Sequence, residues 1–153
     1  DWSSDVCSSD LDGAAATLVC SAEYAREHNL TPLAVIKSMA INGCDPDVMG
    51  LGPIGATRKA LKRAGLEMGD IDIIEINEAF ASQSMACIND LGMDMARVNL
   101  DGGAIALGHP LGATGARITG KAAALLKREG KKYALSTQCI GGGQGITTIM
   151  EAA

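Results

Sequence analysis

The stretch GGAIALGHPLGATGAR, residues 102–117, joins a glycine-broken apolar segment to the longest helix that the sequence predicts. The apolar segment spans residues 98–107, and the predicted helix runs from about Ala113 to Arg128 with its apolar side chains on one face. Gly130 is placed to end this helix. Eleven of the 19 glycines lie between residues 102 and 145, which indicates that backbone approaches something closely in this region.

Outward from this stretch, strand-like apolar runs alternate with helix-like segments. The predicted strands are residues 14–20, 33–41, 71–76, 133–139 and 146–150. The other predicted helices are residues 21–28 with Ser21 as N-cap, 53–64 with Pro53 in the first turn and Gly65 as C-cap, and 78–91 with Asn77 as N-cap. The alternation predicts an α/β fold, in which a layered mixed sheet is flanked by helices and the last two strands form a hairpin.

The composition limits the classes of protein to which the chain can belong. It has 153 residues, of which 47% are hydrophobic, and this length is enough for one globular domain with its own core. The 13 basic residues are outnumbered by 18 acidic ones, so there is no net positive field to hold nucleic acid. The apolar runs are much shorter than the roughly 18 residues that cross a bilayer, so we expect a soluble protein that binds no membrane.

Cysteine usage and the N-terminus indicate the compartment. The five cysteines form no C-x-x-C pair, which argues against a disulfide framework and against a zinc site. No basic segment typical of a secretory signal is visible, so we expect a reducing, cytoplasmic location. The first eleven residues, DWSSDVCSSDL, differ in character from the rest, and we expect a non-native or disordered leader at 1–11 followed by one domain at 12–153.

Three side chains that can do chemistry follow predicted strands or precede a predicted helix: Asn77, His109 and Cys139. In open α/β sheets this edge is where ligands bind. Cys139 begins the run CIGGGQG, in which glycine amides could stabilise an oxyanion beside a nucleophilic or proton-carrying thiol. A buried core cysteine is the competing interpretation.

The other two residues also have two interpretations each. His109 lies in a loop that enters a helix, where the helix N-terminus lowers the pKa of an imidazole and favours a neutral base. It could equally be a structural loop histidine. Asn77 could serve the site or only cap a helix.

A basic face on the helix predicted at 53–64 carries Arg58, Lys59, Lys62 and Arg63. Such a face could contact a phosphate, but a solvated helix face is the more common arrangement. The glycines spell neither a P-loop nor a G-x-G-x-x-G fingerprint, which argues against a nucleotide-binding domain.

Three motifs in this order closely resemble the C-terminal half of thiolases: NEAFA at 77–81, GGAIALGHPLGATGAR at 102–117 and CIGGGQG at 139–145. The weaker segments DGAAA at 12–16 and MGLGPIGATRKAL at 49–61 agree with them. The resemblance covers residues 12–153, essentially everything except the leader. It implies a thiolase-like half-fold and chemistry on CoA thioesters.

The resemblance also implies a role for six residues. His109 would activate the nucleophilic cysteine and point into the oxyanion hole that holds the thioester oxygen, and Asn77 would hold a water that completes that hole. Cys139 would be the second catalytic cysteine, which moves the proton at the α-carbon of acetyl-CoA. Gly141 would donate its backbone N–H to the oxyanion hole of the acyl-enzyme. Ala79 and Phe80 would line the pantetheine side of the pocket.

The implied activity is acyl transfer between 3-ketoacyl-CoA and CoA, giving acetyl-CoA and a shortened acyl-CoA, or the reverse Claisen condensation. LSTQCIGGGQG resembles the fatty-acid β-oxidation branch of the family, and an acetoacetyl-CoA-specific acetyl-CoA acetyltransferase is the alternative within it. An alternative of another class is a non-catalytic half-thiolase that binds CoA or dimerises. The expected ligands are CoA and acyl-CoA as substrates, with no further cofactor and no metal.

One catalytic part has no counterpart in this sequence. In the family, the cysteine that carries the acyl group belongs to the N-terminal half, and no other cysteine of this chain lies in a matching motif. We therefore expect the 153-residue chain to be inactive alone. The family pairs two similar halves across a central helix layer and assembles as homodimers or homotetramers, so this half alone should expose an apolar face.

Overall fold

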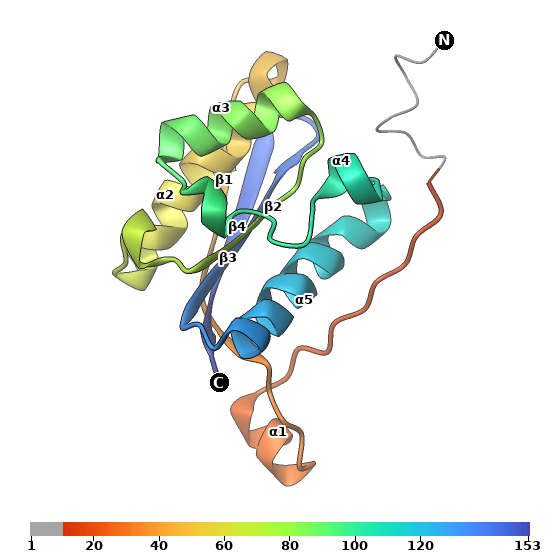
Figure 1. Cartoon of the computed structure of the whole chain (residues 1–153), viewed down its shortest axis with the longest axis vertical. Coiled ribbons are helices and arrows are strands. Elements are labelled where there is room, and N and C mark those ends of the chain that lie inside the picture. Colours follow the sequence, from red (N-terminus) through yellow and green to blue (C-terminus); the bar gives the residue numbers. More distant parts are fainter. Residues whose placement is uncertain (1–10) are drawn as a thin grey trace.

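The computed structural model describes residues 11–153. All but the last residue of the predicted leader at 1–11 lies outside the described residues. The described chain forms a four-stranded sheet with helices on both faces (Figure 1).

The sheet consists of β1 (Ala34–Gly43), β2 (Ile73–Ile76), β3 (Tyr133–Ile140) and β4 (Gln144–Ala152). The strand order is β1-β4-β3-β2. Strand β2 pairs parallel with β3, whereas β3–β4 and β1–β4 pair antiparallel. The predicted mixed sheet and its terminal hairpin are therefore confirmed.

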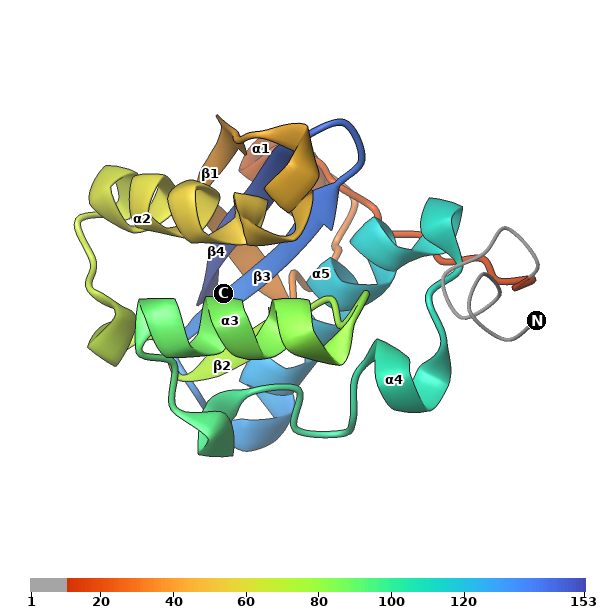
Figure 2. The same cartoon turned by 90° about the horizontal axis from the view of Figure 1, so that it is seen from above.

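Two helices cover one face of the sheet and one long helix covers the other (Figures 1 and 2). Helices α2 (Gly52–Ala64) and α3 (Ala81–Leu91) share the first face, and α5 (Leu111–Glu129) lies on the second. The remaining elements are α1 (Ala22–Glu27), α4 (Ala104–Leu107) and the 3-10 helices η1 (Pro46–Leu51), η2 (Met68–Asp70) and η3 (Met95–Arg97). No helix in residues 11–153 is both long and apolar enough to span a bilayer.

The predicted helix ends are largely confirmed. Ser21 caps α1 by accepting a hydrogen bond from the backbone N–H of Tyr24 at 3.0 Å. Gly65 and Gly130 end α2 and α5 with φ values of 68° and 61°, a left-handed conformation that glycine adopts without strain.

Alternation along β2 divides the core between the two faces. Ile74 and Ile76 pack with α2 and α3, and Ile73 packs with α5 residues such as Leu125. All four residues of β2 are at most 1% exposed, so the strand is buried on both faces, as the short apolar run at 71–76 predicts.

The strand predicted at 14–20 is wrong. Residues 11–20 are exposed and belong to no strand, and they run beside α5 (Figure 1). The segment contacts α5 at Gly120, which has no side chain: a Cβ atom added there would lie 3.1 Å from Cγ2 of Thr17. A strand requires a partner edge, and none of the described strands pairs with this segment.

The N-cap role predicted for Asn77 is also wrong. Helix α3 begins at Ala81, and its N-cap residue is Phe80, which makes no side-chain cap hydrogen bond. The backbone N–H of Asn77 donates to Thr137 O at 2.9 Å instead, which continues the pairing of β2 with β3. Extended backbone therefore persists beyond the end of β2, and the side chain of Asn77 is available for another role.

Candidate active site

The site is built where the chain leaves β2. Residues 77–80 lead from β2 to α3, residues 99–103 run beside them, and residues 108–110 join α4 to α5. Both views place the start of α3, helix α4 and the start of α5 at the same end of the molecule (Figures 1 and 2).

Asn99 attaches the second of these segments to the end of β2. Its Oδ1 accepts from the backbone N–H of Ile76 at 2.9 Å, and its Nδ2 donates to the backbone oxygen of the same residue at 3.0 Å. The side chain thus replaces a neighbouring strand at the point where β2 ends. Asn99 adopts a φ of 46°, a conformation that asparagine tolerates better than most residues.

Glu78 joins the same segments from the other direction. Its Oε1 accepts from Nδ2 of Asn99 at 2.6 Å, and its Oε2 accepts from the backbone N–H of Ile105 in the first turn of α4 at 3.0 Å. Gly103 leaves room for this carboxylate, because a Cβ atom there would overlap it. A negative charge at the first turn of a helix is favourable, so Glu78 fixes α4 and the loop before His109.

His109 is held from both ring nitrogens. Its Nδ1 lies 2.6 Å from Oγ1 of Thr114, and its Nε2 lies 3.3 Å from Nδ2 of Asn77. Burial lowers the pKa of His109, and the positive charge of Arg117 lowers it further. The pKa is thus lowered, as predicted, but the main cause is burial and not the helix N-terminus. The imidazole is kept neutral, the form that can accept a proton.

Asn77 is fully buried next to this imidazole. While its Nδ2 faces His109, its Oδ1 is buried and has no hydrogen-bond partner in the described part of the chain. A buried amide oxygen without a partner is costly, so this atom is a ready acceptor for water or for a ligand. The structure therefore brings together two of the predicted catalytic residues, His109 and Asn77.

Cys139 lies at the end of β3, two residues beyond Thr137, which accepts the hydrogen bond from the Asn77 backbone. Burial raises the pKa of Cys87 on α3, a hydrogen bond from Gln83 lowers it, and proximity to Cys139 raises it. The thiol of Cys139 is therefore close to a second, buried thiol.

Gly141 begins the turn of the β3–β4 hairpin and is exposed. A Cβ atom on Gly141 would meet nothing within 4 Å, so the space beside this residue is open. The following Gly142 and Gly143 have φ values of 85° and 88°, which only glycine adopts easily. The N–H of Cys44 donates to the oxygen of Gly143 at 2.8 Å and fixes the tip of the turn.

The residues predicted to contact pantetheine lie at the surface end of this region. Phe80 is 53% exposed and Ala79 is half-buried, both immediately before α3. An exposed aromatic side chain beside a polar site is a suitable contact for an apolar part of a ligand.

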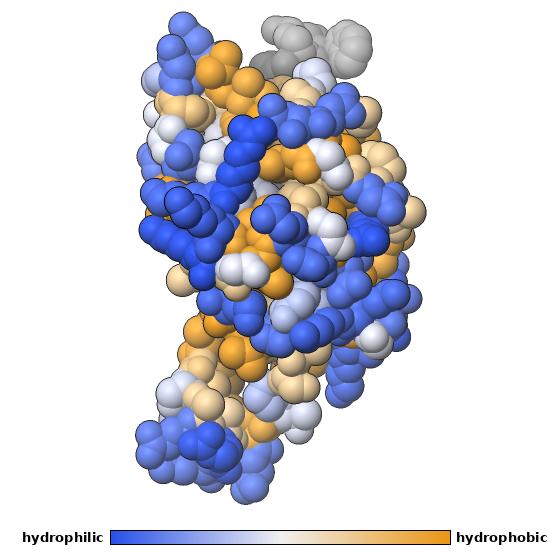
Figure 3. All heavy atoms as spheres, turned by 90° about the vertical axis from the view of Figure 1, so that its left-hand side faces the viewer, coloured by the Kyte–Doolittle hydropathy of each residue, from blue (hydrophilic) through white to orange (hydrophobic). Residues whose placement is uncertain are grey.

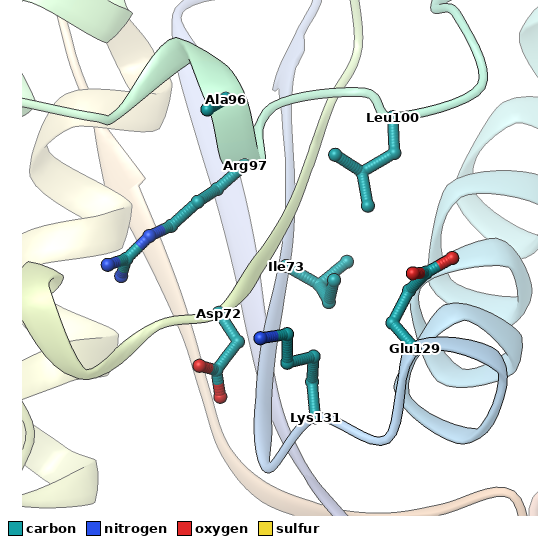
Figure 4. A pocket seen from close by; sticks show the side chains of 7 residues that line it. All are labelled: Asp72, Ile73, Ala96, Arg97, Leu100, Glu129 and Lys131. Atoms are coloured by element: carbon teal, nitrogen blue, oxygen red, sulfur yellow. The ribbon is translucent and has the colours of Figure 1, made fainter.

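A cavity of about 310 Å³ lies elsewhere, at the start of β2 (Figure 4). Two of its charged lining residues are engaged internally: Asp72 Oδ2 accepts from the backbone N–H groups of Lys132 and Tyr133, and Arg97 Nη1 donates to the backbone oxygens of Gly69 and Ile71. This cavity is thus at the opposite end of the strand from Asn77. Within residues 11–153, no group of three or more His, Cys, Asp or Glu residues is placed to hold a metal ion.

Three residues that join these segments or contact His109 were not identified from the sequence: Glu78, Asn99 and Thr114. Glu78 is part of NEAFA, but nothing in that motif says which backbone its carboxylate reaches. Asn99 acts across 23 residues of chain and gives no local signal. Thr114 lies within the long glycine motif, five residues after His109, and this spacing at a helix start could have indicated it.

The fold and the site together define a class of α/β domain, in which a neutral histidine, a buried asparagine and a cysteine lie at one edge of a mixed sheet. The family model described as "Thiolase, C-terminal domain" matches residues 30–152, and the chain belongs to this family.

The chain is similar to 3-ketoacyl-CoA thiolases of several bacteria. It is 58% identical over 144 residues to that of Vibrio vulnificus, a match that covers 92% of this chain and 37% of the relative. It is 55% identical over 143 residues to that of Aeromonas salmonicida, with the same coverage. The chain thus spans a little over a third of the length of these relatives.

Solved structures agree with the sequence relatives. The crystal structure of human mitochondrial 3-ketoacyl-CoA thiolase matches with a TM-score of 0.85 and 50% identity, covering 87% of this chain and 34% of that one. The same enzyme in complex with CoA matches with a TM-score of 0.84. The Bacillus anthracis acetyl-CoA acetyltransferase also matches with a TM-score of 0.84, at 44% identity and the same 87% and 34% coverage.

Proposed function

We propose that the chain is the C-terminal part of the catalytic unit of a 3-ketoacyl-CoA thiolase. The reaction is acyl transfer from a 3-ketoacyl-CoA to CoA, or the Claisen condensation in reverse. The observation that carries the proposal is the contact of the neutral His109 Nε2 with the buried amide of Asn77, in a domain 58% identical to a 3-ketoacyl-CoA thiolase.

The proposed roles combine this geometry with what the resemblance to the family implies. A thiol supplied outside this chain gives its proton to Nε2 of His109, and the resulting thiolate attacks the C3 ketone of the substrate. The C2–C3 bond breaks, and its electron pair remains on the acetyl-CoA fragment as an enolate. Cys139 gives this carbon a proton and becomes a thiolate. CoA then gives its thiol proton to Cys139 and takes the acyl group from the acyl-thioester, and the departing thiolate recovers its proton from His109.

Hydrogen-bond donors would stabilise the charge that develops on oxygen in these steps. His109 acquires an Nε2–H when it takes the proton, and it then points a donor toward the enolate oxygen. Oδ1 of Asn77, which has no partner among the described residues, would hold a water molecule beside it. The N–H of Gly141 in the open hairpin turn would serve the acyl-enzyme, and Phe80 and Ala79 would contact pantetheine.

The finer substrate and the assembly are also proposals. The similarity to bacterial 3-ketoacyl-CoA thiolases supports fatty-acid β-oxidation, while the match to an acetyl-CoA acetyltransferase supports the acetoacetyl-CoA alternative. We further propose that the complete enzyme is a homodimer or homotetramer that uses no cofactor or metal beyond its CoA substrates. The cytoplasm is the proposed location, since the four cysteines in residues 11–153 form no disulfide.

A chimera tests this proposal. Residues 12–153 would replace the aligned part of the Vibrio vulnificus thiolase, and CoA-dependent cleavage of 3-ketoacyl-CoA would be assayed across chain lengths. We expect activity in the chimera and none in the 153-residue chain alone. Replacing Cys139 or His109 by Ala should lower kcat/KM by about 10²-fold or more, whereas Cys20→Ala, a cysteine outside the site, should not. Full activity of Cys139→Ala would refute the proposal, and CoA binding without turnover by an intact chimera would favour a non-catalytic module.

A further inference from the structure

Thr114, in the first turn of α5, is fully buried, and its hydroxyl lies 2.6 Å from Nδ1 of His109. A hydroxyl group carries one proton, and Thr114 donates it to the backbone oxygen of Pro110 at 3.1 Å. Only lone pairs then remain on Oγ1 for the imidazole. In this arrangement Nδ1 of His109 carries a proton and donates it to Thr114.

The contact on the other side of the ring requires the same arrangement. Nε2 of His109 lies 3.3 Å from Nδ2 of Asn77, and an amide nitrogen can only donate. Nε2 must then be the unprotonated nitrogen. Two residues from different elements, one after β2 and one in α5, thus select a single tautomer of His109.

A helix-capping role alone does not explain the position of Thr114. The backbone oxygen of Pro110 already accepts from the N–H groups of Ala113 at 2.9 Å and Thr114 at 3.1 Å. The hydroxyl adds a third donor to this oxygen, which leaves the lone pairs of Oγ1 for His109. The hydroxyl is instead the polar group that meets Nδ1 in a buried environment, where an N–H without an acceptor would be costly.

We propose that Thr114 is a positioning residue, which holds His109 in the Nδ1–H tautomer and keeps the Nε2 lone pair directed at Asn77 and the substrate space. Only the catalytic consequence rests on the proposed function; the tautomer does not. When Nε2 takes a proton from a thiol, the bond from Nδ1–H to Thr114 is retained. The ring therefore need not turn between the neutral and the protonated form.

The competing arrangement reverses these bonds. Thr114 would donate to Nδ1, Nε2 would carry the proton, and the amide of Asn77 would turn its Oδ1 to the ring. That arrangement gives Oδ1 of Asn77 a partner but breaks the bond from Thr114 to Pro110. The two arrangements place the proton of the neutral ring on different nitrogens, so they can be distinguished directly.

Nitrogen-15 NMR of the imidazole rings in the whole 153-residue chain makes the distinction. The chain has two histidines, and His28 is an internal reference, because its Nδ1 faces the backbone oxygen of Tyr24 at 3.0 Å. It follows α1, which Figure 1 places at the opposite end of the molecule from the start of α5. Above the pKa of His109 we expect its proton on Nδ1. Thr114→Val should shift the proton of His109 toward Nε2, Thr114→Ser should retain it on Nδ1, and neither should change His28.

The proposal is overturned if the unmodified chain carries the His109 proton on Nε2, or if Thr114→Val leaves it on Nδ1. The first result needs no variant, so a Thr114→Val protein that fails to fold cannot hide the answer. In the active chimera, Thr114→Val should lower kcat at least about tenfold with little change in KM, and Thr114→Ser should restore it. An Nδ1–H tautomer in an inactive chimera would refute the proposed function and leave this inference standing.

Discussion

Glu75 is an acidic residue in a place where water hardly reaches it. It lies on β2 between Ile74 and Ile76, is 1% exposed, and has no hydrogen-bond partner for Oε1 in residues 11–153. Burial raises its pKa from 4.5 to about 7, although the charges of Lys121 and Arg117 act in the opposite direction. The loss of hydration thus outweighs the attraction of both cations.

This raised pKa predicts how stability depends on pH. Between pH 4.5 and 7 the folded chain holds a proton that the unfolded chain releases, so the free energy of unfolding falls as the pH rises through this window. The loss is at most about 3 kcal/mol. Glu75→Gln should remove this slope and stabilise the chain at pH 8. Urea unfolding at pH 5 and pH 8 measures both effects, with the exposed Glu27→Gln as control; an unchanged slope in Glu75→Gln would contradict the assignment.

At the residue scale, the sequence predicts the groups that are spelled by contiguous motifs. Asn77, His109 and Cys139 are identified because each stands in a long glycine-containing or NEAFA-type motif. Glu78 and Thr114 remain undetected because their roles depend on which backbone or ring atom their side chains reach. That information arises only when α4 and α5 are placed against β2.

Two glycines of CIGGGQG differ in what surrounds them. A Cβ atom on Gly145 would overlap the backbone of Gly52 and Pro53, where α2 begins against β4, whereas a Cβ on Gly141 would meet nothing within 4 Å. We expect Gly145→Ala to lower the free energy of unfolding by about 1 to 3 kcal/mol and Gly141→Ala to leave it nearly unchanged. Denaturant melts of the two variants provide the comparison, and equal stability of the two would show that α2 moves aside freely.

Two basic residues of α2 protect the open edge of the sheet. Strand β1 is an edge strand, and Lys59 and Arg63 donate to its backbone oxygens at Ile41 (3.1 Å) and Met39 (2.5 Å). The solvated-face interpretation of this helix is therefore incomplete, because part of the basic face covers backbone acceptors. Basic side chains at a strand edge hinder pairing with another chain. Polar side chains gather over this side of the molecule (Figure 3).

Removing this protection should promote aggregation. Lys59→Ala/Arg63→Ala leaves the β1 carbonyl groups open to another strand, so we expect faster thioflavin-positive aggregation than in the unmodified chain. Lys62→Ala/Lys127→Ala removes the same charge from positions that make neither contact. If this control aggregates as fast, net charge and not the strand edge would be the cause.

At the element scale, the success of sequence-based prediction depends on where an element finds its partners. Helices α2 and α5 are predicted well because glycine, proline and apolar spacing act locally. The segment 14–20 has the apolar character of a strand, but β structure also requires a neighbouring edge, which the described sheet does not offer it. Asn77 is misassigned because pairing with β3 extends the strand conformation past the residue that would otherwise cap a helix.

The whole molecule has an uneven distribution of apolar surface. On β1, Ser38 and Ala40 face α2, so Met39 and Ile41 project to the opposite face, where both are 53% exposed. Other large apolar side chains are exposed along the extended segment and around the start of α5: Leu18, Val19, Ile105, Leu107 and Leu111. All five of these side chains are more than 60% exposed, which is unusual for so many large apolar residues in one part of a surface.

This surface predicts concentration-dependent association of the 153-residue chain. Met39→Lys/Ile41→Lys should raise the apparent dissociation constant at least about tenfold, because association no longer buries the two apolar side chains. Size-exclusion chromatography with light scattering over a range of concentrations measures the change. Val48→Lys/Met49→Lys, exposed on η1, adds the same charge elsewhere and serves as control.

The chimera distinguishes adventitious association from a packing surface, because the two predict opposite changes in its melting temperature. If the β1 face only causes non-specific association of the 153-residue chain, Met39→Lys/Ile41→Lys raises the melting temperature of the chimera or leaves it unchanged. If the face is covered in the complete thiolase, the same lysines bury two charges, and a buried charge without a partner costs several kcal/mol. We expect the second result, seen as a lower melting temperature of the chimera, with Val48→Lys/Met49→Lys close to the unmodified protein. We thus expect one pair of substitutions to dissociate the 153-residue chain and to destabilise the chimera.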